Sequence, residues 1–136
     1  MDAATIMSFL LSTDPILPET PSFEPEQGAE VQFLGTVRRL EDGRVISGIE
    51  YSAYQPMAEK VLTALLARGQ ADHAPHQVFI QHRLGFVAAE IPSILIRVRT
   101  KHSAAAFSLC HWYLHEVKTT VPIWKKPIWE EAASAR

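Results

Sequence analysis

The stretch GAEVQFLGTVR, residues 28–38, alternates apolar with mostly polar side chains. This period of two predicts a β-strand with one apolar face. The segment EDGR at residues 41–44 follows, and its Asp-Gly pair is typical of a tight hairpin turn. Residues 45–54 then return as a second strand, in which Ile49 and Tyr51 are two positions apart. We therefore expect these two strands to pair as a hairpin.

Two helical periods and two further strands follow. Residues 55–71 show a helical spacing whose expected buried face comprises Met57, Val61, Leu65 and Leu66. Residues 78–85 and 91–100 are typical of strands. Residues 103–121 predict a second helix, capped by Ser103, with a buried stripe of Phe107, Cys110, Leu114, Val117 and Val121. This order predicts an α+β domain with a mostly antiparallel sheet backed by helices.

The region before residue 28 has a different character. Residues 5–11 could form a short helix or a strand, and residues 13–27 contain four prolines, which indicates an irregular surface connector. We predict one domain overall, with residues 28–136 carrying the fold and residues 1–27 forming an N-terminal segment and connector. The first apolar run lacks the preceding positive charge of a secretory signal, so a cytoplasmic location is expected.

Composition limits the functional classes. The chain has 136 residues, 47% of them apolar, which is enough for a packed core. The formal net charge of −2 argues against a nucleic-acid-binding protein, so any anion site requires a local cluster of cations. The single cysteine, Cys110, excludes an internal disulfide and a structural zinc site built from cysteines. Cys110 falls on an apolar helical stripe and is interpreted as a buried structural residue.

The cationic candidates are spread along the chain: Arg38, His102, Lys118, Lys125 and Lys126. His102 and Ser103 begin the second helix, where free backbone N–H groups favour an anion. If folding brings the cations together, the cluster would suit a phosphate. Lys118 lies beside the buried stripe, and a partly desolvated amine there would be a usable base or nucleophile. The alternative is that these are ordinary solvated charges, with the Lys118 stem packed on the core.

A metal site is a weaker alternative. His111 and His115 are four residues apart on one predicted helix, so both can face the same way. The glutamate that a metalloprotease motif requires directly after the first histidine is absent, and no third ligand follows. We therefore predict no metal site, while a metal-dependent hydrolase remains a distinct hypothesis.

Five segments, in this order, resemble the signatures of the molybdopterin synthase large-subunit family: residues 28–38, residues 50–59, residues 82–85, His102 with Ala106 and Phe107, and residues 117–126. Each segment is short, but the set spans residues 28–126. The last segment, which joins Lys118 to Pro122, Trp124 and Lys125, makes the resemblance specific.

The resemblance implies an α/β hammerhead-type domain that forms a homodimer. Each end of the dimer would bind a small ubiquitin-like subunit, giving a heterotetramer. The small subunit carries sulfur as a thiocarboxylate on a Gly-Gly tail, and two transfers to cyclic pyranopterin monophosphate form the molybdopterin dithiolene. The reaction needs no additional cofactor, and neither nucleic acid nor a membrane is an expected partner.

The resemblance also implies residue roles. Lys118 corresponds to the lysine nearest the sulfur-donating tail, and Lys125 to a second essential lysine. The implied substrate-binding residues are Thr36, Val37, Arg38, His102, Ser103, Lys118, Lys125 and Lys126. In the family, part of this pocket is supplied by the other protomer.

Three positions depart from the family pattern. Ser103 stands where an arginine is usual, Ser52 where an acid is usual, and Pro127 where a glutamate is usual. Arg99 or Lys101 could supply the charge that Ser103 lacks. The departures motivate a second hypothesis, in which the chain is a non-catalytic relative that keeps the partner-binding surface.

Overall fold

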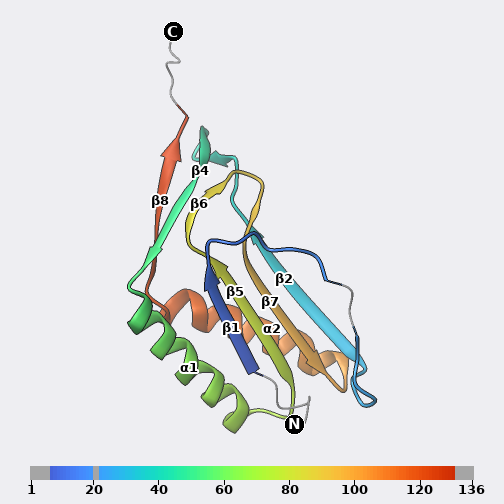
Figure 1. Cartoon of the computed structure of the whole chain (residues 1–136). Helices are drawn as coiled ribbons and strands as arrows, with labels where there is room; N and C mark the ends of the chain where they lie inside the picture. The colour runs from blue at the N-terminus through green and yellow to red at the C-terminus, as the bar shows by residue number, and fades with distance from the viewer. Residues whose placement is uncertain (1–6, 20–21, 131–136) are drawn as a thin grey trace.

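The structure is a computed structural model that describes residues 7–19 and 22–130. Its first sheet has the strand order β1 (Met7–Ser12), β5 (Gln77–Arg83), β7 (Pro92–Thr100) and β2 (Ala29–Thr36). The β1–β5 pair is parallel, and the other two pairs are antiparallel. Helices α1 (Gln55–Asp72) and α2 (Ser103–Thr120) cover one face of this sheet (Figure 1). The main hydrophobic core lies between them.

A second, smaller sheet is built around one long strand. Strand β4 (Arg44–Ala53) pairs with β6 (Gly85–Ala88) on one side and with β8 (Ile123–Trp129) on the other, and β3 (Leu40–Glu41) joins the start of β4. A second core cluster comprises Val37, Ile46, Ile49, Tyr51, Leu84 and Val87. The α+β class is therefore confirmed, with the antiparallel strands divided between two sheets.

The predicted hairpin between residues 28–38 and 45–54 is wrong. The turn forms at the predicted place, with Asp42 and Gly43 both at positive φ, but it joins β3 to β4. Strand β2 pairs with β7 instead, in a register that sets Val31 opposite Val98. Local turn chemistry located the reversal correctly. It could not show that the chain leaves the first sheet before the turn, because β7 lies more than 50 residues later.

The predicted helical faces are confirmed in part, because Leu65, Leu66, Cys110, Val117 and Val121 are buried as expected. In α1 Met57 is 52% exposed, and Ala58 and Leu62 are buried in its place. In α2 Phe107 is 66% exposed, and the buried stripe runs through Ala106, Leu109, Cys110, Tyr113 and Val117. The cap prediction also fails, because His102 is the capping residue and makes no side-chain cap hydrogen bond.

The ends of the chain complete the two sheets. Within residues 5–11 the described part, from Met7 onward, is a strand rather than a helix, and residues 5 and 6 lie outside the described residues. The described part of the proline-rich connector, residues 13–19 and 22–27, contains neither helix nor strand. Strand β8 was not expected from the sequence of the tail. Neither α1 nor α2 has the length and apolar character required to cross a bilayer.

A buried hydrogen bond joins the α1–β5 loop to α2. The Nδ1 of His76 lies 2.7 Å from the carbonyl oxygen of Ala74, so Nδ1 is the protonated nitrogen. The Nε2 atom therefore accepts from the hydroxyl of Tyr113 at 2.6 Å. Gly69 of α1 faces this hydroxyl, and a Cβ at Gly69 would lie 1.9 Å from it. The glycine thus makes room for the bond.

We predict that Gly69→Ala lowers the free energy of unfolding by about 1–3 kcal/mol, because the added methyl group overpacks the core against Tyr113. Helix propensity alone has the opposite sign, since alanine normally stabilises a helix relative to glycine by about 0.5–1 kcal/mol. Urea unfolding measures the change. Ala64→Gly at an exposed position of the same helix is the matched control, and it should also destabilise. A Gly69→Ala variant more stable than the wild type would contradict this account of the core.

Candidate functional site

A cavity of about 470 Å³ lies where the two sheets meet the end of α2. Its walls come from β2, β4, β5, β7, β8 and α2, and its lining residues are Phe33, Gly35, Thr36, Arg38, Tyr51, His82, Ser93, Ile94, Val117, Lys118, Val121, Ile123 and Lys125. Four of the residues predicted from the sequence are therefore brought together: Thr36, Arg38, Lys118 and Lys125.

The two lysines reach the cavity by different routes. Lys118 occupies the last turn of α2, one residue after buried Val117. Only Val121 and Pro122 separate the end of α2 from β8, so the helix leads directly into that strand (Figure 1). Strand β8 then pairs antiparallel with β4 and sets Lys125 opposite Tyr51. Directly opposed residues share one face of a sheet, so Lys125 points to the side on which Tyr51 lies.

Arg38 stands just beyond the end of β2, with its side chain 74% exposed. Its guanidinium lies 3.1 Å from the carboxylate of Glu41. An ion pair this exposed stabilises the fold very little, because water and salt screen it. The guanidinium is therefore able to exchange Glu41 for a ligand in the cavity.

The back wall of the cavity is polar and tightly held. The hydroxyl of Tyr51 donates to Ser93 at 3.1 Å, and the Ser93 hydroxyl donates to the carbonyl oxygen of Gly35 at 3.4 Å. The ring of His82 stacks edge-on against Tyr51, with 5.0 Å between ring centres. Burial lowers the pKa of His82, and the nearby charge of Lys125 lowers it further, against the opposing effect of a hydrogen bond to Arg83.

Two predicted residues, Lys126 and Val37, are sequence neighbours of cavity-lining residues but do not themselves line the cavity. Lys126 alternates with Lys125 along β8 and pairs with Glu50, so it faces the other side of the small sheet. Val37 is 2% exposed and belongs to the second core cluster. Its backbone groups are occupied as well, by hydrogen bonds with Ile91 and Glu90. Val37 therefore packs in the second core cluster and presents no side chain to the cavity.

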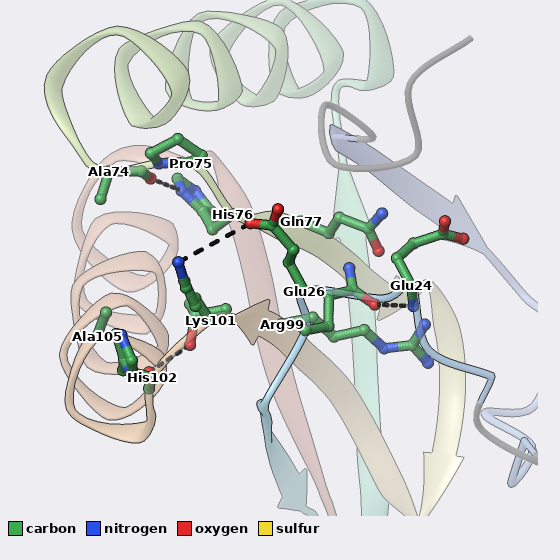
Figure 2. Close-up of a pocket in the computed structure, with 12 residues that line it drawn as sticks. Glu24, Glu26, Ala74, Pro75, His76, Gln77, Arg99, Lys101, His102 and Ala105 are labelled. Atoms are coloured by element: carbon green, nitrogen blue, oxygen red, sulfur yellow. Dashed lines mark hydrogen bonds and ion pairs between the residues drawn. The ribbon is translucent and has the colours of Figure 1, made fainter.

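His102 and Ser103 lie at the opposite end of α2. They are separated from Lys118 by about 23 Å along the helix axis, given the rise of about 1.5 Å per helical residue. His102 lines a different cavity, of about 430 Å³, together with Glu26, His76 and Lys101 (Figure 2). Within one chain, therefore, His102 cannot touch a small ligand that Lys118 also touches.

Arg99 and Lys101 could replace the arginine that the family usually has at the position of Ser103, but only one of them is free to bind a ligand. Arg99 is bonded to Glu30 at 2.6 Å and to the carbonyl oxygen of Ser22 at 2.9 Å, and only 14% of its side chain is exposed. Lys101 is 67% exposed and lies 4.0 Å from Glu26 (Figure 2). Lys101 can therefore move toward an anion near His102, whereas Arg99 supports the fold.

The metal and cysteine hypotheses can be compared with the structure directly. His111 and His115 are both exposed on α2, and within residues 7–19 and 22–130 no three potential ligands are grouped to hold an ion. Cys110 is buried, and burial raises the pKa of its thiol. A thiol that stays protonated is a poor nucleophile, which agrees with the structural role predicted for it.

The electrostatic character of the first cavity follows from its lining. Arg38, Lys118 and Lys125 are cationic, and none of the lining residues in the described chain is a carboxylate. Such a site favours an anionic ligand and stabilises negative charge that develops during a reaction. Sequence reasoning assigned no role to Tyr51, His82 or Ser93. The first two occur in the segments that carry the family resemblance, whereas nothing in the sequence marked Ser93.

The comparisons with known proteins agree with this geometry. The family model described as "MoaE protein" matches residues 11–120. Molybdopterin synthase catalytic subunit of Staphylococcus carnosus is 36% identical over 128 residues, covering 92% of this chain and 85% of that protein. The protein of the same name from Arabidopsis thaliana is 34% identical over 105 residues, covering 77% of this chain and 53% of that protein.

Solved structures show the same fold. Molybdopterin synthase from Staphylococcus aureus superposes with a TM-score of 0.82 at 33% identity, covering 89% of this chain and 90% of that one. A Helicobacter pylori neighbour, solved as a complex of subunits 1 and 2 of molybdopterin-converting factor, has a TM-score of 0.63 at 24% identity. It covers 78% of this chain and 73% of that one.

The matched length differs among relatives. The chain spans about half the length of the plant proteins it matches, at 53% and 54%. It spans most of the two staphylococcal proteins. The family model covers far more than half of this chain, and the α+β fold with its two-sheet junction is shared with a solved member. This chain therefore belongs to the MoaE protein family.

Proposed function

We propose that this chain is the catalytic subunit of a molybdopterin synthase. In this proposal it transfers sulfur from the thiocarboxylated C-terminus of a small ubiquitin-like subunit to cyclic pyranopterin monophosphate, forming the molybdopterin dithiolene. The observation that carries the proposal is the cavity in which Arg38, Lys118 and Lys125 converge without a lining carboxylate. Both reactants are anions, one a phosphate ester and the other a thiocarboxylate, so both suit this lining.

The cavity also explains why the chain needs no reactive cysteine. Sulfur arrives already activated on the partner, and the buried thiol of Cys110 takes no part. Lys118 and Lys125 both have exposed side chains, so a flexible tail can reach them from solvent. Once a tail and a substrate exclude water, the lysine charges act in a lower dielectric and stabilise negative charge more strongly.

A second copy of the chain would complete the site. His102 and Ser103 cannot reach Lys118 within one chain, as the length of α2 shows. In a two-fold dimer, each protomer can present the start of its α2 to the cavity of the other. The exposed face of α2, which includes Phe107, gives such a contact an apolar surface. The proposed assembly is therefore a dimer with a small subunit at each end.

We predict that Lys118→Ala and Lys125→Ala each lower kcat for molybdopterin formation by at least about 100-fold, the usual loss when a proton-transferring or charge-stabilising group is removed. The assay combines the variant, the thiocarboxylated small subunit and the pterin precursor. Lys60→Ala, at an exposed position of α1 remote from the cavity, is the matched lysine control and should keep wild-type turnover. Both cavity variants should still fold and bind the small subunit.

Normal turnover by Lys118→Ala would remove that residue from the mechanism. If the wild-type chain binds the small subunit but makes no product, the chain is instead a non-catalytic relative, the hypothesis that Ser103 motivates.

Shared sites predict complementation between two inactive variants. Lys118→Ala and His102→Ala should each be inactive alone, yet mixing unfolded chains and refolding them together should restore about a quarter of wild-type activity. Random pairing gives about half mixed dimers, and each mixed dimer holds one intact site of two. The control is a chain that carries both substitutions, mixed with wild type. Its mixed dimers contain no intact site, so only the wild-type dimers in that mixture should be active. Absence of any recovery, in mixtures shown to contain mixed dimers, would place His102 outside the site.

A further inference from the structure

We propose that His82 forms an acceptor subsite in the cavity, where its Nε2 receives a hydrogen bond from an N–H or O–H group of the substrate's pterin ring. The proposal rests on the proposed function for the identity of the ligand. It assigns a substrate-recognition role to a residue outside the cationic set.

The backbone determines the tautomer of His82. Its Nδ1 lies 2.8 Å from the carbonyl oxygen of Arg83. A carbonyl oxygen can only accept, so Nδ1 must carry the proton. In the neutral ring Nε2 is then left with a lone pair and no proton. No protein group in the described chain is bonded to this Nε2, and His82 lines the cavity.

The ring is held in place on two sides. His82 is the penultimate residue of β5 and is 9% exposed. Its ring packs edge-on against the ring of Tyr51, with 5.0 Å between the ring centres. Tyr51 is itself anchored through its hydroxyl to Ser93. Because both rings are buried and packed, the His82 ring is held in one rotamer. Its Nε2 lone pair therefore has a fixed position in the cavity wall.

The other polar groups around the cavity have different roles. Arg38, Lys118 and Lys125 can only donate hydrogen bonds. The Tyr51 hydroxyl donates to Ser93 and the Ser93 hydroxyl donates to the carbonyl oxygen of Gly35, so neither hydroxyl has a proton left to donate to a ligand, and their oxygens can only accept. Thr36 is exposed, and its hydroxyl can rotate to donate or accept, so it selects neither. Fixed acceptors on this wall beside three cationic donors therefore favour a ligand that is anionic at one part and carries a hydrogen-bond donor at another.

The charge state of His82 supports this role. Burial chiefly lowers its pKa, and Lys125 adds to the shift, so the ring is neutral and accepting at pH 7. The charged or titratable groups that face it are Arg38, Tyr51, Lys118 and Lys125, with Arg83 adjacent on its own strand. None of these is a carboxylate that would stabilise the protonated ring. Acidification through the lowered pKa would convert Nε2 from an acceptor into a donor.

A pterin ring with a phosphate has both required features. Its fused ring system carries N–H donors, and its phosphate is anionic. With the phosphate held by the cations, a ring N–H directed at His82 would fix the orientation of the carbons that receive sulfur. A phosphate ester without a ring donor would bind the cations but not this subsite.

The experiment compares wild type with His82→Phe, which keeps a packed ring but loses the acceptor, and with His82→Gln, which keeps a side-chain oxygen acceptor. Calorimetry gives the Kd for the pterin precursor, and the sulfur-transfer assay gives kcat and KM separately. For His82→Phe we expect Kd and KM to rise about tenfold, the usual effect of losing one hydrogen bond, with kcat changed less than about threefold. His82→Gln should recover most of the affinity.

Two further measurements test the mechanism. Nitrogen-15 NMR of the histidine ring should show the Nδ1-protonated form in the free wild type, and an Nε2-protonated ring would overturn the proposal. As the pH falls below 6.5, the ordinary pKa of histidine, and through the lowered pKa of His82, the wild-type Kd should rise because the ring gains a proton, while the Kd of His82→Gln should change less. Inorganic phosphate serves as the ligand without a ring donor, and its Kd should not differ between wild type and His82→Phe.

Other outcomes decide against the subsite. Unchanged precursor affinity in a cooperatively folded His82→Phe would exclude it, and equal losses in both variants would show a packing role only. If the wild type binds precursor but forms no product, the proposed function fails while the affinity comparison still tests His82. If the wild type binds no precursor, both proposals fail.

Discussion

The pairing of β8 with β4 is the constraint on which the candidate site depends. Its antiparallel register sets Lys125 opposite Tyr51 and, through strict alternation, directs Lys126 to the other face. Because only two residues join α2 to β8, the same pairing fixes the end of α2 and therefore the position of Lys118. One strand at the end of the described chain thus connects the helix layer of the first sheet with the core of the second.

The described lining of this cavity carries positively charged side chains and no carboxylate. Three cations surround it, the one ion pair among them in the described chain is exposed and weak, and the imidazole of His82 adds a fixed acceptor to its lining. Such an arrangement is poorly suited to holding the native chain together, since like charges repel. It is well suited to a ligand that brings its own negative charge. The stability of the fold comes instead from the two hydrophobic clusters and from buried bonds such as His76 to Tyr113.

Helix α2 separates two groups of residues that the family resemblance places in one site. Lys118 stands at one end and His102 at the other, each beside its own cavity. A rigid helix of 18 residues cannot bend to bring them together. The proposed sharing of the site between protomers would reconcile the resemblance with the geometry. In the proposed assembly, the lysine side chains that are exposed in the single chain would be covered by surfaces of other chains.

The sequence by itself determined the α+β class, both helices, the Asp42-Gly43 turn and, through the resemblance, the two cavity lysines, because these depend on local periodicity, turn chemistry and short motifs. Tertiary structure decided that β2 pairs with β7 rather than with β4, that Phe107 is exposed, and that Val37 and Lys126 do not line the cavity. It also revealed Tyr51, His82 and Ser93 as one polar wall. Strand partners and helix faces are chosen by burial across the whole sheet, where residues more than 50 positions apart compete for the same contacts, and no local pattern contains that information.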